Sequence, residues 1–309
     1  MSEAIELHEL TKDYGKGRGV FDVSFEVRKG EVFGFLGPNG AGKTTTMRQL
    51  MGFVKPDAGT ARIAGYDCFS QRALIQRTLG YLPGEIACMD EMTGAAFLGF
   101  MARMKKLSDR TRLHELTHYF ELDPTPRLRK MSKGTKQKIG LVCAFMGSPE
   151  LLLLDEPTSG LDPLMQGRFV DLVLAEKKRG ATILLSSHLF EEVERTCDRV
   201  AFIRAGRIAA VERLDKVRAS RKRLFDVVFA DADERERFVA RRPQACRVGA
   251  MAAEATVTGG AENMDSFVKE LAEFQITDLA VREQTLEELF LHLYGVDGLG
   301  DVSRGASHE

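Results

Sequence analysis

A glycine-rich segment, GPNGAGKTT, carries a lysine and two threonines directly after an apolar run that ends at Leu36. It fits the pattern G-x-x-x-x-G-K-[ST] at every fixed position, and helical periodicity follows it. Glycines allow successive backbone N–H groups to turn toward phosphate at a helix N-terminus, where the helix dipole also favours anions. We therefore expect a nucleotide-binding loop, in which Lys43 reaches the β- and γ-phosphates and the Thr44 hydroxyl binds Mg²⁺. Its members are Gly37, Pro38, Asn39, Gly40, Ala41, Gly42, Lys43, Thr44 and Thr45.

Two adjacent carboxylates end a second apolar run, LLLLDEP. Asp155 falls at the C-terminal end of the expected strand, which is where open α/β sheets bind their ligands. An aspartate there can hold Mg²⁺ directly or through water, and Glu156 can orient or deprotonate an attacking water. The alternative is a strand followed by an acidic turn. His188, just after a third apolar run, is a candidate sensor of the γ-phosphate, although a lone histidine there can also be purely structural.

The stretch RKMSKGTKQK, residues 129–138, is densely basic and has no acidic residue. Taken alone, it leaves three interpretations open: a nucleic-acid patch, a solvated face, or part of a site for an anion.

Strands and helices alternate through the first two thirds of the chain, which predicts a mostly parallel sheet covered on both faces. The first strands alternate with period two and indicate an antiparallel β-subdomain beside that sheet. The expected helices cover 93–106, 109–121, 134–146, 163–179 and 188–195, and the later strands 150–154, 181–186 and 199–203.

A change of composition near residue 212 predicts a second, smaller α+β domain. We expect a nucleotide-binding domain over 1–212 with a helical subdomain at about 86–147, a charged linker over 213–221, an accessory domain over 222–295, and a disordered tail over 296–309. The accessory domain should contain strands at 223–229, 245–258 and 276–282, and helices at 233–241, 263–273 and 285–294.

Bulk properties exclude several classes of protein. The chain has 309 residues, 44% of them hydrophobic and 29% charged, as in an ordinary soluble globular protein. A net charge of -1 argues against a general nucleic-acid binder. The five cysteines are scattered without metal-ligand spacing, which predicts a reducing compartment. We find neither a signal peptide nor an apolar stretch long enough to span a membrane.

In this order the motifs resemble those of the ATP-binding subunit of an ABC transporter. GPNGAGKTT corresponds to the phosphate loop, LLLLDE to the acidic strand, and His188 to the switch histidine. Within the basic stretch, Ser132, Lys133 and Gly134 match the signature segment, whose serine and second glycine contact phosphate in the family. Asp162, in SGLD, matches the D-loop.

The resemblance also implies that Tyr14 stacks on adenine, although a lone aromatic there can simply pack on the β-subdomain. The closer likeness is to ABC-2-type exporters of the drug-resistance kind, whose signature often contains SKG.

One departure concerns the metal and the attacking water. Where the family has a glutamine that contacts both, this chain has Gly84, which has no side chain to do so. We hypothesise that Glu85 substitutes in part for this glutamine, or that backbone motion at Gly84 couples the site to the membrane partner.

The resemblance implies a head-to-tail dimer of two chains that encloses two ATP molecules with Mg²⁺, each chain's signature closing on its partner's nucleotide. It further implies separate transmembrane permease subunits of ABC-2 type, a place on the cytoplasmic face of the membrane, and no nucleic-acid partner. Residues 86–105 are a candidate contact with the membrane subunit or, alternatively, a core-facing helix. A cassette ATPase of translation or DNA repair is the competing function, but neither a second phosphate loop nor a heptad run is present.

Overall fold

The computed structural model describes residues 3–86, 89–242, 246–248, 253–258 and 264–293. The chain forms two compact units, Met1–Leu214 and Asp215–Glu309, each with its own core. The expected boundary at residue 212 lies within two residues of this division. The stretch expected to be a linker contains a short helix, α8 (Leu214–Ala219).

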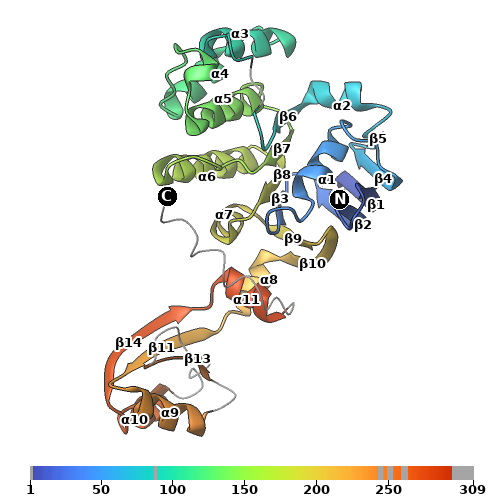
Figure 1. The fold of residues 1–309 in the computed structure, drawn as a ribbon. Helices are drawn as coiled ribbons and strands as arrows, with labels where there is room; N and C mark the ends of the chain where they lie inside the picture. The colour runs from blue at the N-terminus through green and yellow to red at the C-terminus, as the bar shows by residue number, and fades with distance from the viewer. Residues whose placement is uncertain (1–2, 87–88, 243–245, 249–252, 259–263, 294–309) are drawn as a thin grey trace. The chain divides into compact units, whose positions relative to one another are not determined.

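A six-stranded sheet organises the first unit, in the order β10-β9-β3-β8-β7-β6 (Figure 1). All neighbours are parallel except β10, which is antiparallel to β9. The register aligns Leu36 with Ser187 and Asp155 with Ser186, so the carboxyl ends of β3, β7 and β8 meet at one edge. The strands are β3 (Val32–Leu36), β6 (Leu79–Leu82), β7 (Leu151–Asp155), β8 (Thr182–Ser187), β9 (Arg199–Arg204) and β10 (Arg207–Arg213).

An antiparallel sheet, β2-β1-β4-β5, forms the expected β-subdomain. Helix α1 (Lys43–Leu50) contacts β2 and β4 of this sheet and β7 of the central one. Its buried Met47 and Leu50 join the core that also contains Ile5, Val23 and Phe33. The strands are β1 (Glu3–Asp13), β2 (Gly19–Arg28), β4 (Ala58–Ile63) and β5 (Tyr66–Asp67), and helix α2 (Arg72–Thr78) follows them.

A helical subdomain lies between β6 and β7 in the chain and forms a lobe of its own (Figure 1). It comprises α3 (Gly94–Met104), α4 (Thr111–Tyr119), a 3-10 turn at Leu128–Lys130 and α5 (Lys133–Phe145). Thr93 caps α3 by accepting a hydrogen bond from the Ala96 N–H, which fixes where that helix begins.

Two helices complete the first unit: α6 (Pro163–Lys178) and α7 (Phe190–Thr196), which contact each other. Helix α7 packs on β3 at Gly34, where a β-carbon would lie 2.8 Å from Val193 Cγ1 and 3.1 Å from Cys197 Sγ. Only glycine lets α7 lie this close to the strand.

The second unit is the α+β domain expected from the sequence. Its sheet is antiparallel throughout, in the order β12-β13-β11-β14. The buried aromatic rings of Phe225, Phe229, Phe238, Phe267 and Phe274 dominate its core. The elements are β11 (Arg223–Phe229), α9 (Ala232–Arg241), β12 (Cys246–Val248), β13 (Glu254–Thr258), α10 (Met264–Leu271), β14 (Ile276–Glu283) and α11 (Leu286–Leu293). The tail expected to be disordered, 296–309, lies outside the described residues.

The close packing at Gly34 predicts a loss of stability on substitution. Gly34→Ala should lower the free energy of unfolding by about 1–3 kcal/mol, because the added methyl group displaces α7. Gly167→Ala is the matched control: no heavy atom lies within 4 Å of a β-carbon there, and residue 167 is inside α6. It should leave stability unchanged or raise it by up to about 1 kcal/mol. Urea unfolding of both variants measures the difference, and equal effects would contradict the packing argument.

Candidate functional site

A cavity of about 530 Å³ collects residues from four segments that are distant in sequence. They come from the glycine-rich loop and α1, from the turn after β6, and from the ends of β7 and β8. The lining residues are Asn39, Thr44, Arg48, Gly84, Glu85, Glu156, Ser159 and His188. The candidates for phosphate, metal and water chemistry therefore meet at the edge where the parallel strands end.

The glycine-rich loop has the backbone geometry that its sequence predicts. Gly40 and Gly42 have φ angles of 80° and 112°, in the left-handed region that favours glycine. A β-carbon at Gly37 would lie 2.3 Å from the Ile203 carbonyl oxygen. Gly42 is the residue before the first turn of α1, so the loop ends at a helix N-terminus that can receive an anion.

Lys43 points back into the loop. Its Nζ donates hydrogen bonds to the carbonyl oxygens of Gly37 at 2.6 Å and Pro38 at 3.2 Å, and it lies 3.0 Å from Glu156 Oε1. The side chain is buried, so this carboxylate supplies the countercharge that a buried ammonium requires. The cation thus lies between the phosphate loop and the acidic residue that follows β7.

Glu156 is held in a strained backbone conformation that turns its carboxylate toward the loop. Its φ is 49°, and its N–H donates to the carbonyl oxygen and the Oγ of Ser186, each at 3.1 Å. A non-glycine residue in this region costs on the order of 1–3 kcal/mol, so the surrounding contacts must hold Glu156 in it. The other carboxylate oxygen, Oε2, lies 2.6 Å from His188 Nδ1. Glu156 is therefore fixed between a lysine and a histidine.

Asp155 has the surroundings of a metal ligand. The residue is fully buried, Oδ1 accepts a hydrogen bond from Ser186 Oγ, and Oδ2 has no hydrogen-bond partner among the described residues. Burial raises the pKa of this carboxyl, while hydrogen bonds from Ser186 and Thr44 oppose the rise. A buried carboxylate oxygen without a partner, next to a threonine hydroxyl, suits a hard cation that prefers oxygen ligands. The residues present therefore fit Mg²⁺.

The basic Ser/Gly segment does not line this cavity. Ser132 is exposed and caps α5, accepting a hydrogen bond from the Thr135 N–H at 3.1 Å. Gly134 lies against Gly160, since a β-carbon on it would be 2.5 Å from the Gly160 carbonyl oxygen. The Ser132–Gly134 segment is thus not part of the lining of its own chain's cavity, and its role toward a second chain stays a prediction.

Comparisons with known proteins identify the chain. A family model described as "ABC transporter" matches residues 20–159. The daunorubicin resistance ATP-binding protein DrrA3 of Streptomyces coeruleorubidus is 33% identical over 305 residues, which cover 95% of this chain and 96% of that protein. The chain belongs to the ATP-binding subunits of ABC transporters. The bacitracin transport ATP-binding protein BcrA of Bacillus licheniformis is 32% identical over 76% of this chain and 78% of its own length.

Solved structures agree with this assignment. The ATP-binding subunit of an ABC transporter is 34% identical, with a TM-score of 0.65, over 70% of this chain and 92% of that one. The predicted cassette fold and the predicted ATPase activity of the transporter type are therefore confirmed, rather than those of a translation or repair ATPase. Among the described residues, no helix is long and apolar enough to cross a membrane.

Two further cassette residues lie outside the cavity lining. Asp162 is exposed and caps α6 through the Met165 N–H at 2.9 Å, so it fixes the start of that helix. Tyr14 is 48% exposed at the turn between β1 and β2, with Lys12 Nζ 5.9 Å from its ring centroid. A β-carbon on Gly42 would touch Val20, so this hairpin adjoins the phosphate loop. Stacking of Tyr14 on adenine remains a prediction.

Sequence reasoning missed Gln137, which links α5 to the backbone at Glu156 and Pro157. Its buried amide Nε2 donates to the carbonyl oxygens of Glu156 at 3.1 Å and Pro157 at 2.9 Å. The sequence offered one signal for this role, a glutamine three residues after Gly134 on an expected helix that is otherwise rich in lysine.

A second missed residue, Glu192, supports the turn that carries His188. Its Oε2 accepts a hydrogen bond from Ser187 Oγ at 2.5 Å, and the same hydroxyl accepts from the Leu189 N–H at 3.0 Å. Burial raises the pKa of the Glu192 carboxyl to about 7, and the nearby charge of Glu156 adds to this rise.

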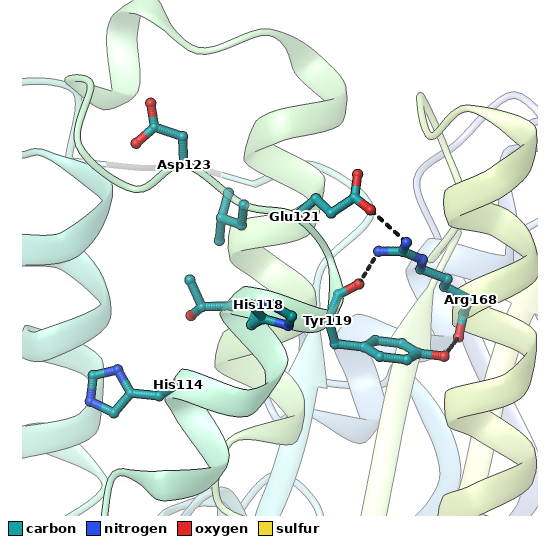
Figure 2. A pocket seen from close by; sticks show the side chains of 8 residues that line it. His114, His118, Tyr119, Glu121, Asp123 and Arg168 are labelled. Atoms are coloured by element: carbon teal, nitrogen blue, oxygen red, sulfur yellow. Dashed lines mark hydrogen bonds and ion pairs between the residues drawn. The ribbon is translucent and has the colours of Figure 1, made fainter.

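A larger cavity, of about 750 Å³, lies at the end of α4 and contains none of the nucleotide-site residues. Figure 2 shows how Arg168 of α6 reaches across it. The guanidinium donates to the Tyr119 carbonyl oxygen and pairs with Glu121 at 2.5 Å, while Tyr119 Oη donates to the Arg168 carbonyl oxygen at 2.9 Å. A second ion pair joins α4 to α6, between Arg112 and the buried Glu176 at 2.8 Å. The contacts of Arg168 and of Arg112 thus attach the helical subdomain to α6.

The raised pKa of Glu192 predicts a pH-dependent stability difference. The folded protein holds the Glu192 proton more tightly than the unfolded chain does. Protonation of Glu192 therefore contributes fully to the free energy of unfolding below pH 4.5, and this contribution is lost as the pH rises to about 7. Glu192→Gln should therefore gain stability relative to the wild type between pH 5 and pH 8, by no more than about 3 kcal/mol.

Urea unfolding at the two pH values measures this change. Glu191→Gln, on an exposed side chain of the same helix, is the control and should show no such shift. A pH-independent difference for Glu192→Gln would contradict the assignment.

Proposed function

We propose that this chain binds ATP with Mg²⁺, closes as a head-to-tail dimer of two chains, and powers export of drug-like or antibiotic compounds through separate membrane subunits. The main structural support is one cavity lined by Thr44, Glu156 and His188, with Lys43 paired to Glu156 and Asp155 directly before it in the chain. Full-length similarity to a daunorubicin resistance protein supports the class of cargo.

Phosphate binding rests on the loop Gly37–Thr45. Its backbone N–H groups and the N-terminus of α1 receive the phosphates, and Lys43 exchanges the two loop carbonyls for phosphate oxygens. Thr44 and Asp155 hold Mg²⁺, which supplies neutralising charge to the phosphates when bound.

Hydrolysis rests on Glu156 and His188. Glu156 is the general base or water-orienting group, since its carboxylate faces the cavity and is fixed on both sides. His188 lies 2.6 Å from the Glu156 carboxylate and lines the cavity, which supports a role as the sensor of the γ-phosphate. In the dimer, Ser132, Lys133 and Gly134 of one chain close on the partner's γ-phosphate at the N-terminus of α5, and Asp162 crosses the interface.

Gly84 and Glu85 together take the place of the family's glutamine. A β-carbon at Gly84 would lie 2.9 Å from the unpartnered Oδ2 of Asp155, so a side chain here would crowd the metal position. The next residue, Glu85, is exposed and lines the cavity, which supports a role for its carboxylate toward metal-bound water. Coupling through backbone motion at Gly84 is the alternative.

The membrane contact lies on the segment 86–105. Within its described part, Leu98 and Ala102 are buried, whereas Met89 and Met104 are 51% and 66% exposed. One face of α3 thus packs inward and exposed methionines remain for a helix of a membrane subunit. Such a complex operates at the cytoplasmic face of the membrane, with ABC-2-type permeases and without nucleic acid.

Separating ATP binding from hydrolysis tests this function directly. Glu156→Gln should keep ATP binding and lose on the order of 10²-fold or more in kcat, because the base is gone while the phosphate loop is intact. Fluorescence measures nucleotide binding, and phosphate release from the same sample measures hydrolysis. Normal turnover in this variant would remove Glu156 from the mechanism.

A signature substitution tests closure between two chains. Ser132→Arg should keep ATP binding and abolish hydrolysis, because the bulky side chain blocks the partner's γ-phosphate. Lys138→Ala, in the same basic stretch, is the control and should leave turnover within about twofold of wild type, as a partly exposed side chain with no assigned role. Equal loss in both variants would point to a general effect on folding.

The role of Glu85 is tested by two substitutions. Glu85→Ala should lower kcat about 10- to 100-fold and raise the Mg²⁺ concentration needed for half-maximal activity, as loss of a metal-supporting group does. Glu85→Gln, which restores a side chain able to hydrogen-bond water, should recover part of this loss. Unchanged activity in Glu85→Ala would favour the backbone-motion alternative.

A further inference from the structure

Strand β14 is an edge of the C-terminal sheet. It pairs with β11 on one side, and no strand of the described residues pairs with it on the other. An edge strand presents a row of backbone N–H and C=O groups to any segment that can add to the sheet. Proteins usually protect such an edge with prolines, bulges or short strands, whereas β14 runs eight residues without proline, and the register shift in its pairing with β11 lies at its start, near Ile276.

The apolar face of the sheet continues onto this edge. Val281 lies opposite Phe225 and Leu279 opposite Val227, so both share the face that forms the core. Phe225 and Val227 are buried, yet Val281 is 56% exposed and Leu279 43% exposed. Helix α9 contacts β11 and β13, and the Phe267 ring of α10 packs on Phe225 at 4.8 Å. Among the described residues, the helices therefore cover the middle of the sheet and leave Leu279 and Val281 exposed.

The sequence of β14 is complementary to itself. Consider two copies of β14 paired antiparallel about a two-fold axis normal to the sheet. Residues directly opposite each other must point to the same face, so their numbers differ by an even number. The centre of the pair therefore falls at a residue, which lies opposite its own copy. An axis at Ala280 places Asp278 opposite Arg282, and Leu279 opposite Val281, twice each. An axis at Asp278 or at Arg282 places like charges opposite each other, which is unfavourable. Axes at Leu279 or Val281 pair no opposite charges.

We propose that β14 pairs with β14 of a second copy of this chain, antiparallel and centred on Ala280, to form one continuous sheet. Leu279 and Val281 supply the apolar contact. The charges select the register and add little to the affinity, because Arg282 is already bound to Asp226 at 2.6 Å and to Glu288 at 2.8 Å within its own chain. This pairing requires no nucleotide, so it is independent of the ATP-driven closure proposed above.

A disulfide cross-link tests the register. In the full-length chain with Cys88 and Cys246 replaced by serine, Ala280→Cys should form a covalent dimer on mild oxidation without nucleotide. The Cα atoms of residues opposite each other in an antiparallel pair lie about 4.5–5.5 Å apart, within the range that a disulfide spans. Thr277→Cys in the same background is the control: its two copies would lie roughly 20 Å apart and should not cross-link. Cross-linking at 277 but not at 280, or at neither, would overturn the proposal.

Sedimentation of the nucleotide-free chain tests the contact itself. The wild type should be a dimer and Val281→Lys a monomer, because a lysine on each side of the new pair places charge in the apolar strip. Ala272→Lys adds the same charge at an exposed position outside β14 and should remain a dimer. Circular dichroism checks that each variant is folded. A wild-type monomer, a Val281→Lys dimer, or equal loss in both variants would each contradict pairing through β14.

Discussion

The contact between Lys43 and Glu156 is the interaction around which the nucleotide site is built. Lys43 is buried and Glu156 is partly buried, and each charge is satisfied by the other across a distance of 3.0 Å. The contact requires β3 and β7 to end at the same edge, which the parallel register with β8 between them provides. It also requires the left-handed backbone at Glu156, and Ser186 of β8 and Gln137 of α5 hold that backbone in place.

This dependence explains which parts of the site could be predicted from the sequence. The phosphate loop, the acidic pair and His188 follow from local patterns, since each is a short motif at the end of an apolar strand. The roles of Ser186 and Glu192 could not be predicted, because each depends on neighbours that only the folded chain brings near, and Gln137 was marked only by its place on a lysine-rich helix. Strand β6, of four residues, also carries too short an apolar run to be recognised, although it positions Gly84 and Glu85. The in-trans role of Ser132 stays a prediction, since it concerns a second chain.

Glycine makes two of the close contacts between parts of the cassette possible. At Gly84 the chain after β6 approaches the Asp155 carboxylate, and at Gly134 the signature helix approaches Gly160 beside the D-loop. A side chain at Gly134 would push the two backbones apart, and a side chain at Gly84 would displace the Asp155 carboxylate. The helical subdomain is therefore coupled to the catalytic edge through backbone contacts at one end, and to α6 through Arg168 and Arg112 at the other.

Pairing through β14 would change the thermodynamics of the ATP-driven step. Two free cassettes must lose translational freedom each time they close on nucleotide, which costs several kcal/mol. Two chains already joined at β14 close in an intramolecular step, at an effective concentration that can reach about the millimolar range for a short tether. Because both contacts are isologous, their two-fold axes must coincide for the pair to remain closed. The C-terminal sheet would then hold the cassettes together when hydrolysis releases them, so that each cycle opens the nucleotide sites without separating the chains.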